Sequence, residues 1–160
     1  MERSAASTSG GVYFRSYQPG DLDALYALDT ICFTEPFRFS RRLMAQLVDA
    51  PYAHTIVADE ESVVAGFVIV HMEHWERELI AYIMTLDVTP EQRRHGLATE
   101  LMQRAEEAAR EVHADALALH VWVENEGAVR FYEGAGYQRV ELVERFYNEA
   151  GNAWLYRKPL

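Results

Sequence analysis

The stretch VTPEQRRHGLATELM, residues 88–102, places two arginines, a histidine and a glycine where an apolar run ends and a helical pattern begins. Pro90 ends the apolar run, and from Leu97 onward apolar residues recur at helical spacing. The first turn of a helix carries unpaired N–H groups and the positive end of the helix dipole, so cationic side chains there are locally unfavourable. The arrangement makes sense if an anion binds at this helix start.

Composition bounds the class of protein. The chain has 160 residues, which suits one domain, and 49% of them are hydrophobic, enough for a sizeable core. The formal net charge of −10 argues against nucleic acid or a membrane surface as a partner and mildly favours a cationic substrate. Cys32 is the only cysteine, which excludes an internal disulfide and makes a reducing compartment plausible.

The chain start and the hydropathy pattern suggest where the protein resides. The opening MERSAASTSGG lacks the apolar segment of a signal peptide, and no apolar run is long enough to span a bilayer. We therefore expect a cytoplasmic protein with a flexible tail over residues 1–10 and a single domain over residues 11–160.

Hydrophobic periodicity predicts the order of the secondary-structure elements. A strand is followed by two helices, three strands, a helix, a strand, a helix and two strands. This order predicts an α/β fold (an α+β mixed sheet) of about seven strands with helices on both faces. The expected strands are 12–18, 54–60, 62–73, 78–88, 116–123, 137–147 and 153–160, and the expected helices are 21–33, 40–48, 92–112 and 126–136.

A strand, a glycine-containing loop and a helix in this order can build an anion site. Glycine lets the backbone approach a phosphate closely, and Arg93, Arg94 and His95 would add positive charge around it. The Gly-Lys-Ser/Thr ending of a P-loop and the three glycines of a dinucleotide-binding motif are both absent. On these residues alone, a tight turn relieved by Gly96 and flanked by solvated arginines is an equally good interpretation.

Two motifs together carry a family resemblance. RRHGLA fits a signature of Arg or Gln, two residues, Gly, one residue, then Gly or Ala, and ENEGAVRFYEGAGY resembles an asparagine–helix–tyrosine segment. In both respects the chain resembles the GNAT superfamily of acyl-CoA-dependent N-acetyltransferases. The segments ICFTEPF and RFYNEAGNAWLYRKPL make it most like the enzymes that acetylate protein N-termini, the ribosomal-protein alanine type. The matching positions are Arg93, Gly96, Ala98, Asn125, Ala128, Phe131, Tyr132, Gly136 and Tyr137.

The resemblance implies a GNAT-like acyl-CoA N-acyltransferase fold with acetyl-CoA as co-substrate and no metal. Acetyl-CoA would lie between the diverging ends of the strands YIMTLDV and ALALHVW, with its pyrophosphate on the N–H groups of the helix start. A backbone N–H near Val88 would polarise the thioester carbonyl. Asn125 would contact the CoA arm or cap the helix that follows it. The implied cofactor-binding residues are Leu86, Val88, Arg93, Arg94, His95, Gly96, Leu97, Ala98, Thr99, Asn125 and Tyr132.

Catalysis in such an enzyme needs a base for the amine and an acid for the departing thiolate, but no protein nucleophile. The lone cysteine is accordingly expected in a helix far from the motifs. Tyr132 matches the family's general acid, with an ordinary packing role as its alternative. Twelve residues before Tyr132, His120 occupies a position that resembles that of a glutamate base in enzymes of the ribosomal-protein alanine type. The unperturbed pKa of histidine, about 6.5, suits a base. A merely half-buried histidine is the alternative, in which case water or Glu124 would be the base.

The implied reaction is transfer of an acetyl group to a primary amine by direct attack. A protein N-terminal α-amine is the expected acceptor, contacted by Phe33, Phe37 and Tyr147. Lysine side chains, small amines, or a weakly catalytic acyl-CoA-binding sensor remain alternatives. A monomer or a homodimer fits equally well. A metal site is not expected, because His71 and His74 of HMEHWE would point to opposite faces of a strand.

Overall fold

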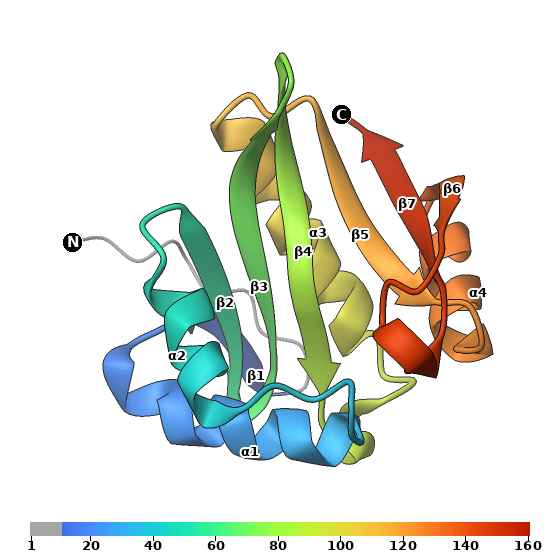
Figure 1. Cartoon of the computed structure of the whole chain (residues 1–160). Helices are drawn as coiled ribbons and strands as arrows, with labels where there is room; N and C mark the ends of the chain where they lie inside the picture. The colour runs from blue at the N-terminus through green and yellow to red at the C-terminus, as the bar shows by residue number, and fades with distance from the viewer. Residues whose placement is uncertain (1–10) are drawn as a thin grey trace.

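The computed structural model describes residues 11–160, so the predicted tail over residues 1–10 lies outside the described residues. The described chain forms one seven-stranded sheet in the order β1-β2-β3-β4-β5-β7-β6, which confirms the predicted mixed fold (Figure 1). The strands are β1 (Val12–Ser16), β2 (Ala53–Glu60), β3 (Val63–Trp75), β4 (Glu78–Val88), β5 (Ala116–Trp122), β6 (Gln138–Val143) and β7 (Ala153–Pro159). The helices are α1 (Leu22–Cys32), α2 (Arg41–Asp49), α3 (Leu97–Glu111) and α4 (Glu126–Gly134), with single 3₁₀ turns η1 (Pro19–Asp21), η2 (Pro90–Gln92) and η3 (Asn148–Ala150).

Strands β4 and β5 are the parallel pair of the sheet, and they separate after a short stretch. Their pairing runs only from Ile80 opposite Ala116 to Tyr82 opposite Ala118. The register of β4 against β3 shifts at Met84, which is a β-bulge, and such a bulge bends the strand and increases its twist. The two strands therefore diverge toward the C-terminal end of β4 (Figure 1).

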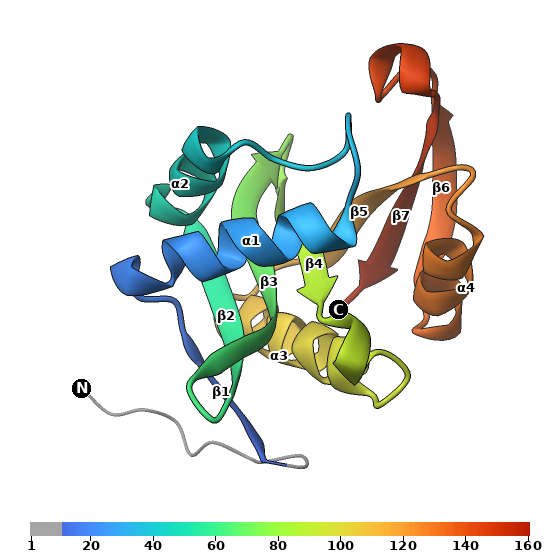
Figure 2. The same ribbon diagram turned by 90° about the horizontal axis from the view of Figure 1, so that it is seen from below.

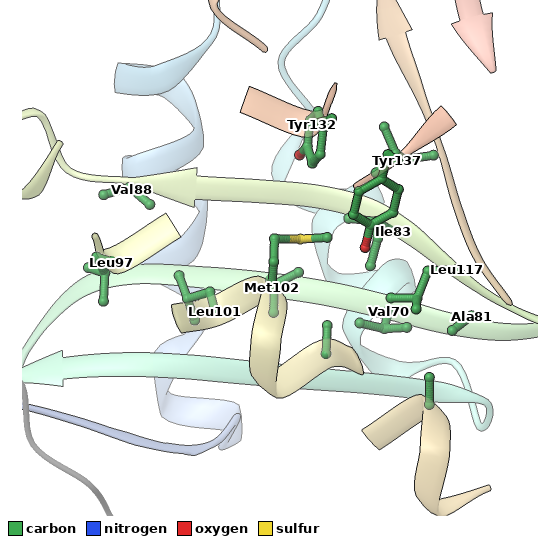
Figure 3. Close-up of a cluster of buried hydrophobic side chains, with 14 of the residues drawn as sticks. Val70, Ala81, Ile83, Val88, Leu97, Leu101, Met102, Leu117, Tyr132 and Tyr137 are labelled. Atoms are coloured by element: carbon green, nitrogen blue, oxygen red, sulfur yellow. The ribbon is translucent and has the colours of Figure 1, made fainter. Parts of the chain in front are cut away.

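Helices cover both faces of the sheet, as expected from the sequence. Helices α1 and α2 lie on one face, and α3 and α4 lie on the other (Figure 2). Leu97, Leu101 and Met102 of α3 pack against β3 and β4 in the larger core cluster, which Tyr132 of α4 also joins (Figure 3). A second cluster joins α1 and α2 to the other face of β2 and β3. The larger core cluster thus holds α3 and α4 together on one face of the sheet.

Two predicted boundaries differ from the structure by more than two residues. The long helix begins at Leu97 instead of Gln92, because η2 and a turn over 93–96 precede it. The left-handed φ angles of Arg94 (68°) and Gly96 (83°) interrupt helical geometry there. Strand β6 ends at Val143 instead of Tyr147, and a turn carries the chain from Glu144 toward η3. Both corrections leave loops beside the diverging ends of β4 and β5.

Candidate active site

A cavity of about 610 Å³ opens where β4 and β5 separate. Its walls come from α1 and the loop after it, from β4, β5 and α4, and from the loop before η3. The lining residues are Cys32, Phe33, Thr34, Phe37, Phe39, Tyr82, Ile83, Met84, Thr85, Leu86, Leu119, His120, Val121, Trp122, Asn125, Ala128, Phe131, Tyr132, Phe146 and Tyr147. Segments far apart in the sequence therefore meet around one space.

The start of α3 has the features of an anion site. Gly96 is the N-cap residue in a left-handed conformation, and a Cβ added there would meet no atom within 4 Å. Among the described residues, no side chain caps this helix start. The N–H groups of Leu97, Ala98 and Thr99 belong to the first turn, where they have no acceptor four residues back. An open approach and unpaired donors fit the pyrophosphate that the sequence predicts here.

The three basic side chains before α3, those of Arg93, Arg94 and His95, differ in their surroundings. Arg93 turns back toward β4, donating from Nε to the carbonyl of Val88 (3.3 Å) and from Nη2 to Sγ of Cys32 (3.5 Å). Arg94 and His95 are exposed in the turn. Arg93 therefore braces the end of β4, whereas Arg94 and His95 are the ones free to reach an anion's periphery.

The expectation that the lone cysteine lies far from the motifs is wrong. Cys32 ends α1, lines the cavity and donates from Sγ to the carbonyl of Val88 at 3.4 Å. Sequence separation hid this contact, because α1 reaches the end of β4 only through the tertiary packing. Burial raises the pKa of the Cys32 thiol, and the carboxyl of Asp87 adds to this effect. Cys32 is thus a poor nucleophile, consistent with direct attack by an amine.

Strand β4 presents its unpaired edge to the cavity. Leu86 lines the cavity, whereas the side chain of Val88 is buried in the core. Because β4 pairs with β5 only up to Tyr82, the backbone beyond it has no partner strand on that side. An extended ligand such as a pantetheine arm fits along this edge as an added strand would.

Asn125 performs the capping role that was one of its two predicted roles. It is the N-cap of α4, and its Oδ1 accepts from the N–H of Ala128 at 3.1 Å. Asn125 also lines the cavity, so capping fixes it at the cavity wall.

Tyr132 lies on α4 and belongs to the larger core cluster (Figure 3). It also lines the cavity. Its ring packs edge-on against Phe131 and Tyr137, with centroids 5.0 and 5.7 Å away. Burial raises the pKa of the Tyr132 hydroxyl, and the nearby Asp87 and Tyr147 raise it further. The hydroxyl is therefore protonated at neutral pH, which is the state that a general acid requires.

His120 lies on β5 with Tyr82 and Phe146 as its immediate neighbours. A hydrogen bond of 2.6 Å joins the Tyr82 hydroxyl to Nδ1 of His120, and Phe146 stacks on the imidazole with centroids 4.1 Å apart. Burial lowers the pKa of His120 and raises that of Tyr82. The imidazole is therefore neutral at neutral pH and held in one orientation, as a base should be.

Sequence reasoning missed Tyr82 and Phe146. The signal for Tyr82 was the parallel register of β4 and β5, which sets Tyr82 opposite Ala118, two residues before His120. Phe146 was assigned to a strand that ends three residues earlier, at Val143. Glu124, the alternative base, is not among the residues that line the cavity. Strand β5 ends at Trp122, which leaves Glu124 exposed in a turn outside the cavity wall.

The three predicted acceptor residues, Phe33, Phe37 and Tyr147, all line the cavity. Phe37 lies 4.8 Å from Trp122 and 5.0 Å from Tyr147 between ring centroids, and Phe33 lines the same cavity. Burial raises the pKa of Tyr147 to about 12, so its hydroxyl stays neutral. No residue of the lining set is Asp, Glu, Lys or Arg. The expected acidic attraction of a cationic substrate therefore does not come from the cavity wall.

The described residues 11–160 contain neither a candidate metal cluster nor a candidate membrane-spanning helix. Within this range, no cluster of three or more His, Cys, Asp and Glu side chains could hold a metal ion. Buried His71 instead hydrogen-bonds through Nε2 to the carbonyl of Leu47 at 2.8 Å. No helix in the same range combines the length and apolar character needed to cross a membrane.

The family can now be assigned. The acetyltransferase (GNAT) family profile matches residues 22–137, more than half of the chain. The chain belongs to the GNAT family. This match confirms the predicted enzyme class, an acetyl-CoA-dependent acetyltransferase.

Similar proteins include enzymes named for N-terminal acetylation. The catalytic subunit NAA10 of the N-terminal acetyltransferase A complex from Arabidopsis thaliana is 30% identical over 142 residues, covering 88% of this chain and 73% of NAA10. The structure of Arabidopsis thaliana NAA60 with acetyl-CoA has a TM-score of 0.82 at 20% identity, covering 93% of this chain and 98% of that one. The ribosomal-protein-S18-alanine N-acetyltransferase from Escherichia coli has a TM-score of 0.79 at 19% identity, covering 92% and 93%.

Proposed function

We propose that this enzyme transfers the acetyl group of acetyl-CoA to the α-amino group of a protein N-terminus by direct attack. The observation that carries the proposal is the cavity where β4 and β5 separate, whose uncharged and largely aromatic wall contains His120 and Tyr132. The open helix start at Gly96 follows β4 along the chain and lies outside the cavity lining. The curated relatives named for N-terminal acetylation support the choice of acceptor. Phe33, Phe37 and Tyr147 are the proposed acceptor-binding residues.

The donor site would extend from the cavity wall at Leu86, Asn125 and Tyr132 to the helix start at Gly96. Acetyl-CoA supplies the activated acetyl group when bound there. The N–H groups of Leu97, Ala98 and Thr99 would hold the pyrophosphate at Gly96, with Arg94 and His95 at its edge. The free edge of β4 around Leu86 would bind the pantetheine arm, and the backbone near Val88 would orient the carbonyl.

His120 would take the proton from the acceptor amine. An α-amine in water has a pKa of roughly 8, so part of it is neutral at pH 7 and a base need only assist. If Nδ1–H donates to the Tyr82 oxygen, the lone pair on Nε2 is available to receive the proton. Stacking on Phe146 keeps the ring at the cavity wall during this transfer.

Tyr132 would donate its proton to the departing thiolate. Because burial raises its pKa, the hydroxyl is protonated at neutral pH, and its O–H can donate to the sulfur as the C–S bond breaks. Phe131 and the core pack around the ring of Tyr132 and hold its hydroxyl in position.

A peptide panel tests the proposal. The full chain is mixed with acetyl-CoA and peptides that vary in their first residue, each also supplied with a blocked N-terminus and a free lysine. We expect free CoA above the hydrolysis background, and mass spectrometry should place the acetyl group on the α-amine. Modification of only the lysine would assign a different acceptor. Tight acetyl-CoA binding without thiol release from any amine would make the chain a binding module.

We also propose a cytoplasmic enzyme that works as a monomer or homodimer on a peptide partner, with no nucleic acid or membrane involved. The reduced lone cysteine and the acidic net charge support this setting. Analytical ultracentrifugation measures the oligomeric state, and fractionation of the source cells measures the location.

A further inference from the structure

Two buried carboxyl groups lie directly behind the cavity wall. Asp29 of α1 is 0% exposed and Asp87 of β4 is 1% exposed. The contact of Cys32 Sγ with the carbonyl of Val88 at 3.4 Å joins the end of α1 to the end of β4, and it brings these two carboxyl groups near each other. The neighbouring Asp29 accordingly raises the pKa of Asp87. Among the described residues, neither carboxyl group forms an ion pair with a basic side chain within 4.0 Å. Two negative charges side by side in this setting would be strongly unfavourable.

Each carboxyl group has one satisfied oxygen and one without a partner. Oδ2 of Asp29 accepts from the N–H of Phe39 at 2.8 Å, and Oδ1 of Asp87 accepts from the hydroxyl of Thr85 at 2.6 Å. Oδ1 of Asp29 and Oδ2 of Asp87 are buried, and neither has a hydrogen-bond partner within the described residues. One proton placed between these two oxygens would satisfy both.

The charges around the pair favour a proton on Asp87. Burial and the neighbouring Asp29 raise the pKa of Asp87, while the hydroxyl of Thr85 and the charge of Arg93 act in the opposite direction. Cys32 of α1 and Tyr132 of α4 also face Asp87, and an ionised Asp87 would raise the pKa of both. Arg93 is the cation that acts on Asp87 across this site, and it donates to Val88 and Cys32 instead of Asp87.

We propose that Asp87 is the protonated member of this pair and donates from Oδ2 to Oδ1 of Asp29. This bond holds Asp29 against the end of β4. Through the N–H of Phe39, Asp29 then holds the acceptor loop, which we define as residues 33–40. Phe33, Thr34, Phe37 and Phe39 of this loop line the cavity. Asp29 and Asp87 are thus positioning residues that set the acceptor wall against the strand that binds the donor.

A substrate-free measurement tests the shared proton. Carbon-13 NMR of carboxyl-labelled aspartates should show one carboxyl that remains protonated at neutral pH and whose signal is lost in Asp87→Asn. Exchange of the Phe39 amide should be slow in the wild type and in Asp87→Asn, but faster in Asp87→Ala. Complete ionisation of all aspartates at neutral pH would overturn the proposal. It would also be overturned if Phe39 exchanged equally fast in wild type and Asp87→Ala.

Kinetics then test the positioning role, which rests on the proposed acetyl transfer. Asp87→Ala leaves the Asp29 charge buried without its partner and should raise the acceptor KM about ten- to a hundredfold. Its kcat and its acetyl-CoA affinity should each change less than about threefold. Asp23→Ala, on an exposed turn of the same helix, is the matched control and should behave as the wild type. An Asp87→Ala variant with an unchanged acceptor KM would refute positioning.

The pH profile separates this role from a purely structural one, and needs no unstable variant. Asn at position 87 donates to Asp29 at every pH, whereas the aspartic acid stops donating once it loses its proton. The ratio of the acceptor KM of wild type to that of Asp87→Asn should therefore rise in alkaline solution. Titration of the acceptor amine affects both proteins and cancels in the ratio. A ratio that stays constant with pH would contradict the proposal. If no amine is acetylated at all, the NMR and exchange results still decide whether the pair exists.

Discussion

The two proposed binding regions, one for the donor and one for the acceptor, are built in opposite ways. The donor region, residues 86–99, is one continuous piece of chain from the end of β4 to the first turn of α3. The acceptor region joins the acceptor loop, Tyr82 of β4, His120 of β5 and the loop at Phe146 and Tyr147. The donor region offers backbone N–H groups and open space, whereas the acceptor region offers packed, neutral aromatic rings. The donor region depends on the local conformation of one segment, whereas the acceptor region depends on the register of the sheet.

Tyr132 lies where the two regions meet, so its loss should have the largest effect on turnover. Tyr132→Phe keeps the ring in the core but removes the proton donor, and kcat should fall about 10²- to 10⁴-fold. Acetyl-CoA affinity should stay within about threefold of the wild-type value, since the donor region is untouched. Steady-state kinetics and calorimetry measure the two quantities. A kcat within about threefold of wild type would leave Tyr132 with a packing role only.

Gly96→Glu should damage the donor region alone. The new side chain would enter the open space at the helix start, its charge would repel a pyrophosphate, and the left-handed φ of 83° would be strained. We expect a Kd for acetyl-CoA at least about 100-fold higher, measured by calorimetry on a folded variant. Gly11→Glu is the matched control, because Gly11 also has a left-handed φ (88°) and open surroundings. Equal acetyl-CoA binding by the two variants would remove the anion site from the donor region.

His120→Ala should damage the acceptor region alone. We expect kcat/KM to fall about 10- to 100-fold and the acidic limb of its pH profile to disappear. Because burial lowers the pKa of His120, the wild-type limb should lie below the ordinary histidine value of about 6.5. His120→Glu should restore some activity and move the limb to lower pH. Glu124→Gln, on the exposed turn after β5, should change neither rate nor profile. A limb that survives in His120→Ala would assign the base elsewhere.

Tyr82→Phe sharpens the same comparison with a smaller effect. The variant keeps the ring beside His120 but loses the 2.6 Å hydrogen bond that orients the imidazole. We expect kcat to fall about three- to tenfold, with unchanged acetyl-CoA affinity. Rates that match the wild type across the pH range would show that Phe146 stacking suffices to orient His120.

Salt should have the smallest effect. The net charge of −10 predicts some preference for peptides with a basic second or third residue, but the cavity lining contains no acidic side chain. Any advantage must therefore come from the long-range field, which is screened over about 10 Å at 0.1 M salt. We expect kcat/KM for basic over neutral peptides to drop no more than about threefold from low to high salt. A larger drop would point to a specific acidic contact outside the lining residues.

The sequence carried most of the information about the donor region and little about the acceptor region. Arg93, Gly96 and the helix after them could be placed because the strand, the turn and the helix follow each other directly. Even there, the turn chemistry at Arg94 and Gly96 shifted the helix start to Leu97. The contact of Tyr82 with His120 could not be predicted without the register of β4 against β5. Helix α3 lies between these two strands in the sequence, so their register cannot be read along the chain. The contact of Cys32 with Val88 was hidden for the same reason.

By itself, the sequence determined the order of the elements, the motif-bearing loop and the composition of a core with two apolar faces. Periodicity and backbone chemistry are properties of neighbouring residues, so they can be read along the chain. Only the tertiary structure decided that β4 bends away from β5 at the Met84 bulge, and that Asp29 meets Asp87 in the interior. Both depend on which buried surfaces and polar groups find partners across long sequence separations. That matching is a property of the packed chain as a whole.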